Sequence, residues 1–299
     1  MGVSSRFILE QRRVIGALLR SGFEAMSEKP SSGAAPVAPG PLLKETIAAP
    51  SPELIAAYVK HVGGDPASYR GTIPAHLFPQ WVFPMQTASL RGLPYPLHKV
   101  LNGGFRMERK ANLPQGEKLQ IEGRLAKIDD DGRRVILHCD STTGTASAPG
   151  ALDVSMQAII PTPKKDGKGG GKGGPKKSGP RVPENAKELA RWSLRVDSGR
   201  DFAKLTGDIN PIHWIPPAAR ASGFRNVILH GFSTSARAYE GVIRNVFSGD
   251  TEAIRAFECR FTKPLVLPAR VGLYRTGDEV FVGEAPGGPA YLVGKFETK

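Results

Sequence analysis

Apolar residues recur every three or four positions in the stretch that begins at residue 230. The spacings are four, three, four and three, for Phe232, Ala236, Tyr239, Ile243 and Val246. Residues with this spacing share one face of an α-helix. Gly249 follows the last of them, and glycine commonly ends helices. The pattern therefore predicts a helix with one apolar face.

Four short runs follow this helix: "AIRAFECRF", "VGLYRTG", "EVFVGEA" and "AYLVGKFET". They are rich in Val, Phe and Tyr, and Gly, Pro and Asp residues separate them. Such runs are typical of antiparallel β-strands. One apolar helix with several antiparallel strands predicts an α+β domain in which the helix is buried on the sheet.

The first half of the chain repeats this order of elements. "YVKHVGGDPASYR", from Tyr58, resembles "FAKLTGDINPIH", from Phe202, in its aromatic start, its apolar position and its Gly-Asp pair. The stretches 105–123 and 257–277 each read as a strand, a Leu-Pro pair and a second strand. We infer two distant repeats of one unit.

Two segments poor in apolar residues divide the chain. An N-terminal helix and a flexible Pro/Ala tether are expected over 1–41, a first repeat over 42–162, a Gly/Lys linker over 163–183 and a second repeat over 184–299. The net charge is +13, and the linker region holds about half of it. Its glycines and like charges favour an extended coil, and its spacing does not fit a phosphate-binding loop.

Composition excludes several classes of protein. The sequence has no run of eighteen apolar residues, so we expect no membrane-spanning helix. Its two cysteines are far apart, which indicates neither a metal cluster nor a disulfide framework and fits a reducing cytoplasm. The basic N-terminal helix lacks the features of a secretory signal, although organelle targeting stays open. We interpret it as a packing or surface helix.

The stretch "LTGDINPIH", from Leu205, combines an acid, an amide, a proline and an imidazole within six residues. Its Gly-Asp and Asn-Pro pairs are common turn formers. A turn alone does not require the histidine, so the segment is a candidate for chemistry.

This stretch, together with "AARASGFRNVILHGFSTSAR" from Ala218, resembles the signature of the MaoC-type (R)-specific enoyl-CoA hydratases. The resemblance includes Thr-Gly-Asp-x-Asn-Pro-x-His and the Ile-x-His-Gly entry to the predicted helix. The first half resembles the degenerate repeat of family members with two such domains. The resemblance implies a double hot dog fold, in which two repeats form a pseudo-dimer and each wraps an antiparallel sheet around a long central helix.

The same resemblance implies reversible addition of water to trans-2-enoyl thioesters. Asp208 and His213 would hold one water and move its protons, and Asn210 would hold their loop. The backbone N–H of Gly231 would stabilise the charge on the thioester oxygen. Neither a metal nor a redox cofactor is implied.

The substrate would be carried by CoA or by an acyl-carrier protein, both of which bear phosphate. Arginines near the motif are the candidate contacts: Arg220, Arg225 and Arg237. A homodimer remains open, and we do not expect nucleic acid as a partner.

The first repeat departs from the motif. Asp65 matches Asp208, but Ala67, Ser68 and Arg70 replace the Asn, Pro and His. We therefore expect this repeat to shape an acyl tunnel rather than to run the same chemistry.

Two prolines, Pro79 and Pro84, predict that the central helix of the first repeat starts late or is interrupted. We hypothesise that the resulting bend opens space for a bulky acyl chain.

Other interpretations remain. A hot dog thioesterase would direct water at the carbonyl carbon, and the motif spacing disfavours that. The basic linker motivates a non-catalytic binder of acyl thioesters or nucleic acid. His230, just before the predicted helix, could shape the site, although we favour a hydrogen-bonded structural role.

Overall fold

The computed structural model describes residues 2–27, 36–97, 100–132, 134–161 and 179–299, with side chains from 21 to 27 left out. The tether predicted after residue 27 and most of the predicted Gly/Lys linker therefore fall outside the described residues. No described helix has the length and apolar character needed to span a membrane.

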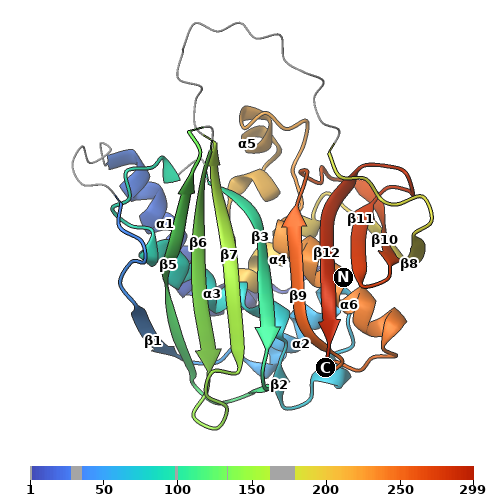
Figure 1. The fold of residues 1–299 in the computed structure, drawn as a ribbon, viewed down its shortest axis with the longest axis horizontal. Coiled ribbons are helices and arrows are strands. Elements are labelled where there is room, and N and C mark those ends of the chain that lie inside the picture. The colour runs from blue at the N-terminus through green and yellow to red at the C-terminus, as the bar shows by residue number, and fades with distance from the viewer. Residues whose placement is uncertain (1, 28–35, 98–99, 133, 162–178) are drawn as a thin grey trace, which may run out of the picture.

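Ten strands form one antiparallel sheet, seen face-on in Figure 1. The first half contributes β1 (Leu43–Ile47), β3 (Leu101–Arg109), β5 (Leu119–Asp130), β6 (Arg134–Gly144) and β7 (Leu152–Pro161). The second half contributes β8 (Lys187–Leu194), β9 (Ile254–Phe261), β10 (Ala269–Thr276), β11 (Glu279–Gly283) and β12 (Ala290–Thr298). Two short strands, β2 (Thr72–Ile73) and β4 (Leu113–Pro114), pair separately.

The two halves of the sheet have the same strand order. From its outer edge to the centre, the first half runs β1-β5-β6-β7-β3 and the second runs β8-β10-β11-β12-β9. They join where β3 pairs antiparallel with β9, with Phe105 opposite Cys259. The predicted repeat is confirmed, and all four strands expected after the central helix are present.

The main helices cover one face of this sheet and lie behind it in Figure 1. They are α2 (Pro52–Val62), α3 (Pro79–Ser89), α4 (Ser198–Thr206) and α6 (Gly231–Val246). Shorter segments connect them: η2 (Pro66–Tyr69), η3 (Ala75–Leu77), η5 (Pro211–His213) and α5 (Pro216–Ala221). Four of the five residues predicted on the apolar face of α6 are buried, and Val246 is half-buried. The fold is the expected α+β double hot dog.

The central helix of the first half starts late, as its prolines predict. The α3 helix begins at Pro79 and has 11 residues, whereas α6 has 16. Pro84 lies inside α3 without ending it. The cavity between this helix and Gly123 holds about 10 Å³, roughly the room for one water, and the hypothesis of extra acyl space stays a prediction.

The N-terminal segment packs on the core. It comprises η1 (Ser5–Gln11) and α1 (Arg12–Ser27), and its buried side chains are Phe7, Gln11 and Val14. Gln80 donates to the Gln11 amide oxygen, which fixes the segment to α3. The expectation of a packing helix is confirmed for its described side chains.

A buried polar contact also links the two halves. His76 Nε2 lies 2.8 Å from Glu240 Oε1, and both side chains are almost fully buried. A side chain at Gly64 would collide with the Glu240 carboxylate, so glycine is required there. Burial raises the pKa of Glu240 to about 7 and lowers that of His76 well below its ordinary value.

We expect Glu240→Gln to gain stability relative to the wild type as the pH rises. Below pH 4.5 the carboxyl is protonated in both folded and unfolded chains. Between pH 4.5 and about 7 the unfolded chain ionises first, so the wild type loses stability. The relative gain should reach about 3 kcal/mol at pH 8, measured by urea unfolding. Exposed Glu279→Gln is the control, and a difference independent of pH would contradict the prediction.

Candidate active site

The candidate loop begins where α4 ends. Gly207 has φ 79°, the left-handed conformation that terminates many helices. A Cβ at Gly207 would lie 2.7 Å from that of Val14, so the N-terminal segment also requires glycine here. Asn210 Oδ1 then accepts from the backbone N–H of Ile212 at 3.3 Å and caps η5. The local sequence thus places Asp208 before η5 and His213 at its end.

The His213 ring is held in one orientation by the backbone. Its Nδ1 lies 2.8 Å from the carbonyl oxygen of Ile228, and a carbonyl can only accept. Nδ1 therefore carries the proton in the neutral ring and Nε2 keeps a free lone pair. His213 is buried, with 9 % of its surface exposed. This arrangement leaves Nε2 as a base.

A second imidazole lies against the first. The rings of His213 and His230 stack with centroids 3.7 Å apart and planes 25° apart. His230 Nε2–H donates to the backbone oxygen of Asp208 at 3.0 Å, and its distance to Asp208 Oδ2 is 3.8 Å. Burial first, and the neighbouring His213 second, lower the pKa of His230 to about 3. His230 is therefore neutral at pH 7.

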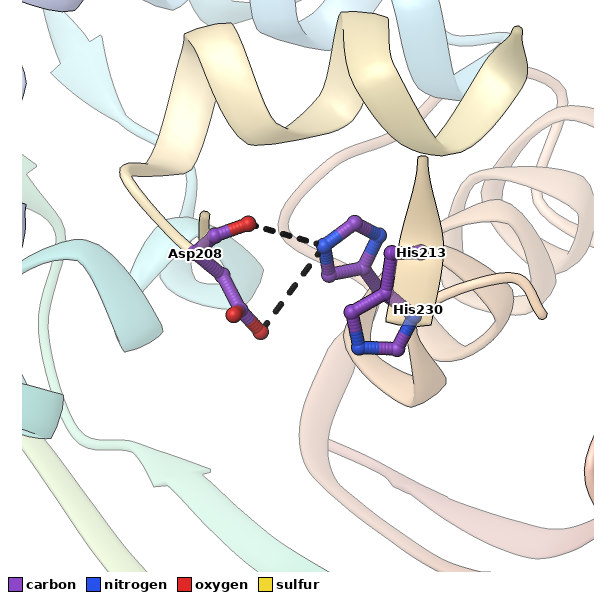
Figure 2. A group of neighbouring side chains, drawn as sticks. All are labelled: Asp208, His213 and His230. Atoms are coloured by element: carbon purple, nitrogen blue, oxygen red, sulfur yellow. Dashed lines mark hydrogen bonds and ion pairs between the residues drawn. The ribbon is translucent and has the colours of Figure 1, made fainter. Parts of the chain in front are cut away.

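The Asp208 carboxylate and the two rings form one cluster, shown in Figure 2. Side-chain atoms of Asp208, His213 and His230 lie within 4.8 Å of one another. Two hydrogen bonds through a single water span up to about 5.6 Å. Asp208 is half-buried, with 30 % of its side chain exposed. The direct contact of Asp208 is with His230, and a water shared by Asp208 and His213 stays a prediction.

Gly231 begins α6 and has an unexpected neighbour. The Phe261 ring lies 3.0 Å from the position of a Cβ on Gly231, so a larger residue there would have to displace this ring of β9. Backbone N–H groups in the first turn of a helix have no partner within the helix. The oxyanion role of Gly231 stays a prediction.

The three candidate arginines have different surroundings. Arg220 and Arg225 are exposed near α5. Arg237 is half-buried, and its guanidinium lies 3.4 Å from His61 Nε2. Burial lowers the pKa of Arg237 to about 10, and burial with the Arg237 charge lowers that of His61 to about 4. The phosphate-contact role of all three arginines stays a prediction.

The cluster of one carboxylate and two imidazoles also has the residue types of a metal site. However, His213 Nδ1 and His230 Nε2 already donate to backbone carbonyls. The remaining nitrogens belong to nearly parallel stacked rings, whose in-plane lone pairs do not converge on one point. We assign no metal to this arrangement.

Comparison with known proteins places this loop in a family. A model of the MaoC-like domain matches residues 181–278, which include the whole cluster. The second half of the chain carries a MaoC-like domain. The enoyl-CoA hydratase ChsH3 of Mycobacterium tuberculosis is 31% identical over 176 residues, which cover 58% of this chain and 60% of that relative. The chain thus matches less than two thirds of the relative's length.

The likeness to solved structures extends over both halves. The crystal structure of HtdX of Mycobacterium tuberculosis superposes with a TM-score of 0.68 at 19% identity, covering 87% of this chain and 100% of that one. A second protein of that organism, described as having a double hot dog fold, gives 0.57 at 14% identity and covers 87% of this chain and 96% of its own. The fold around the MaoC-like domain is therefore shared.

His230 has more contacts with the candidate residues than the sequence predicts. Its hydrogen bond was expected, but its partner is the residue that carries the candidate acid, and its stacking on His213 was not foreseen. The Ile-x-His-Gly pattern contained the residue, whereas only the three-dimensional structure shows its neighbours.

The two imidazoles should have opposite neutral tautomers. We expect the Nδ1–H form for His213 and the Nε2–H form for His230, and His230 should stay neutral below pH 5 because its pKa is about 3. Nitrogen-15 NMR of histidine-labelled protein distinguishes the two forms, with His213→Gln and His230→Gln used for assignment. An Nε2–H form for His213 would remove the basis for its role as a base.

Proposed function

We propose that this protein catalyses the reversible addition of water to trans-2-enoyl thioesters, with (R) stereochemistry implied by the family. The observation that carries the proposal is the placement of the Asp208 carboxylate within 4.8 Å of a ring nitrogen of His213, whose tautomer is fixed by its bond to the Ile228 carbonyl. Similarity of the MaoC-like domain to an enoyl-CoA hydratase supports it. The same catalyst must accelerate dehydration of (R)-3-hydroxyacyl thioesters.

In the proposed mechanism, one water lies between Asp208 and His213. His213 Nε2 takes a proton from this water while the oxygen bonds to the β-carbon, and the thioester oxygen gains negative charge. A proton from the Asp208–His213 pair then bonds to the α-carbon, which restores both groups. Water supplies the hydroxyl and, in net terms, the added hydrogen.

His230 serves this mechanism as a positioning residue. Its Nε2–H holds the backbone of Asp208, and its ring sets the plane of His213. Because its low pKa keeps it neutral, it adds no positive charge beside the base. The Gly231 N–H, in the unpaired first turn of α6, is the proposed donor to the thioester oxygen.

Asp208→Asn and His213→Ala should each lower kcat on crotonyl-CoA by about 10²–10⁴-fold, since each removes a proton-transfer group. Loss of enoyl absorbance with the thioester intact measures hydration. Asp65→Asn is the matched control, because Asp65 is the exposed counterpart in the first repeat. Release of free thiol by the wild type would indicate a thioesterase instead, and absence of any turnover would leave a binding protein.

His230→Phe should lower kcat by about tenfold to a hundredfold while KM changes little, because the lost donor misplaces Asp208 without removing a reacting group. His230→Gln keeps an N–H donor and should recover part of the rate. Equal rates in the two variants, or a change confined to KM, would argue against a positioning role. The pH–rate profile should keep its shape in both variants.

A further inference from the structure

A surface hollow lies beside the candidate loop. It has a volume of about 360 Å³ and is lined by Arg195, Val196, Asp197, Arg200 and Trp214. Volumes of this size are typical of pockets for small ligands. None of its residues belongs to the sequence motif, which ends at His213, directly before Trp214.

The apolar part of the hollow is unusually exposed. Trp214 and Val196 are 39 % and 41 % exposed, and both belong to the small group of large apolar residues left exposed in the described chain. The indole N–H of Trp214 donates to the carbonyl of Ile209 at 3.0 Å, which fixes the ring. A fixed, exposed indole is a platform on which a planar base can stack.

The charged part of the hollow favours anions. Arg195 holds Asp197 through two contacts, at 2.7 and 3.0 Å, and this pairing lowers the pKa of the Asp197 carboxyl. Arg200 is exposed and forms no ion pair with the residues that the structure describes. The hollow is lined by two guanidinium groups and one carboxylate, so its net charge is positive. An arginine without a carboxylate partner can bind phosphate through two parallel hydrogen bonds.

The residues of the hollow lie in the same elements that position the candidate catalytic groups. Trp214 is bonded to Ile209, the neighbour of Asp208 in the chain. Gly199, one residue before Arg200, packs so closely on the backbone oxygen of His213 that a side chain there would collide with it. A ligand seated in the hollow therefore lies next to the loop that carries the acid and the base.

We propose that this hollow binds the nucleotide end of CoA, with the adenine on Trp214 and a phosphate on Arg200. The inference rests on the proposed function, which makes the substrate a thioester. A planar base can stack on Trp214 and a phosphate can pair with Arg200, and CoA supplies an adenine and phosphates in one group. A carrier-protein substrate has the phosphate of its pantetheine but no purine. The protein is thus specific for CoA thioesters.

Calorimetric titration with adenosine 3′,5′-bisphosphate tests the hollow without any turnover. We expect saturable binding to the full-length wild type, about tenfold or more weaker in Trp214→Ala and in Arg200→Gln. Arg244→Gln and Arg270→Gln are matched controls, because both arginines are exposed, lie outside the candidate motif and do not line the hollow. Equal weakening in the controls, or no binding to the wild type, would overturn the proposal.

Kinetics with two thioesters separate this inference from the proposed function. Trp214→Ala and Arg200→Gln should raise KM for crotonyl-CoA about tenfold and leave kcat/KM for crotonyl-N-acetylcysteamine, which has no nucleotide, unchanged. Equal losses on both substrates would indicate damage to the loop and contradict the proposal. Bisphosphate binding without turnover of either thioester would refute the hydratase function alone. Hydration of both thioesters without bisphosphate binding would refute nucleotide binding in the hollow and leave the hydratase function in place.

Discussion

The hydrogen bond from His213 Nδ1 to the carbonyl oxygen of Ile228 is the interaction on which the candidate chemistry depends. It joins η5 to the segment leading into α6, so it fixes the position of the ring and the nitrogen that stays free. Without it, either tautomer could form, and the separation from Asp208 would carry no chemical meaning. The His230 stack adds to this constraint because it restricts the plane of the same ring.

The pseudo-symmetric fold places a histidine just before the central-helix segment of each half, and the two have different partners. His230 contacts the backbone of Asp208, whereas His76 contacts Glu240, a side chain from α6 of the other half. The carboxylate that contacts the histidine of the first half therefore comes from the other half of the pseudo-dimer, and both side chains are buried. The same framework supports an accessible acid in one half and a structural link in the other.

Sequence periodicity predicted most of the fold because the determining signals are local. The α6 face, the strands β9–β12 and the late start of α3 follow from apolar spacing and proline geometry. The tight packing beside α3, which leaves only about 10 Å³, could not be predicted, because it depends on side chains from distant strands meeting the helix. The pairing of His76 with Glu240 has the same origin, since 164 residues separate them.

The arginines show where proximity in sequence misleads. Arg237 lies in α6, seven residues after His230, and its side chain contacts His61 of the first half. Arg195 precedes α4 and Arg200 lies in its first turn, both N-terminal to the motif, and the packing of α4 on the His213 loop brings them to Trp214. A helix distributes its side chains around its axis, so a charged residue is assigned to a surface only after its packing is known. In the proposed CoA site, the phosphate contact would therefore come from the helix that supports the candidate loop, rather than from the loop's own sequence.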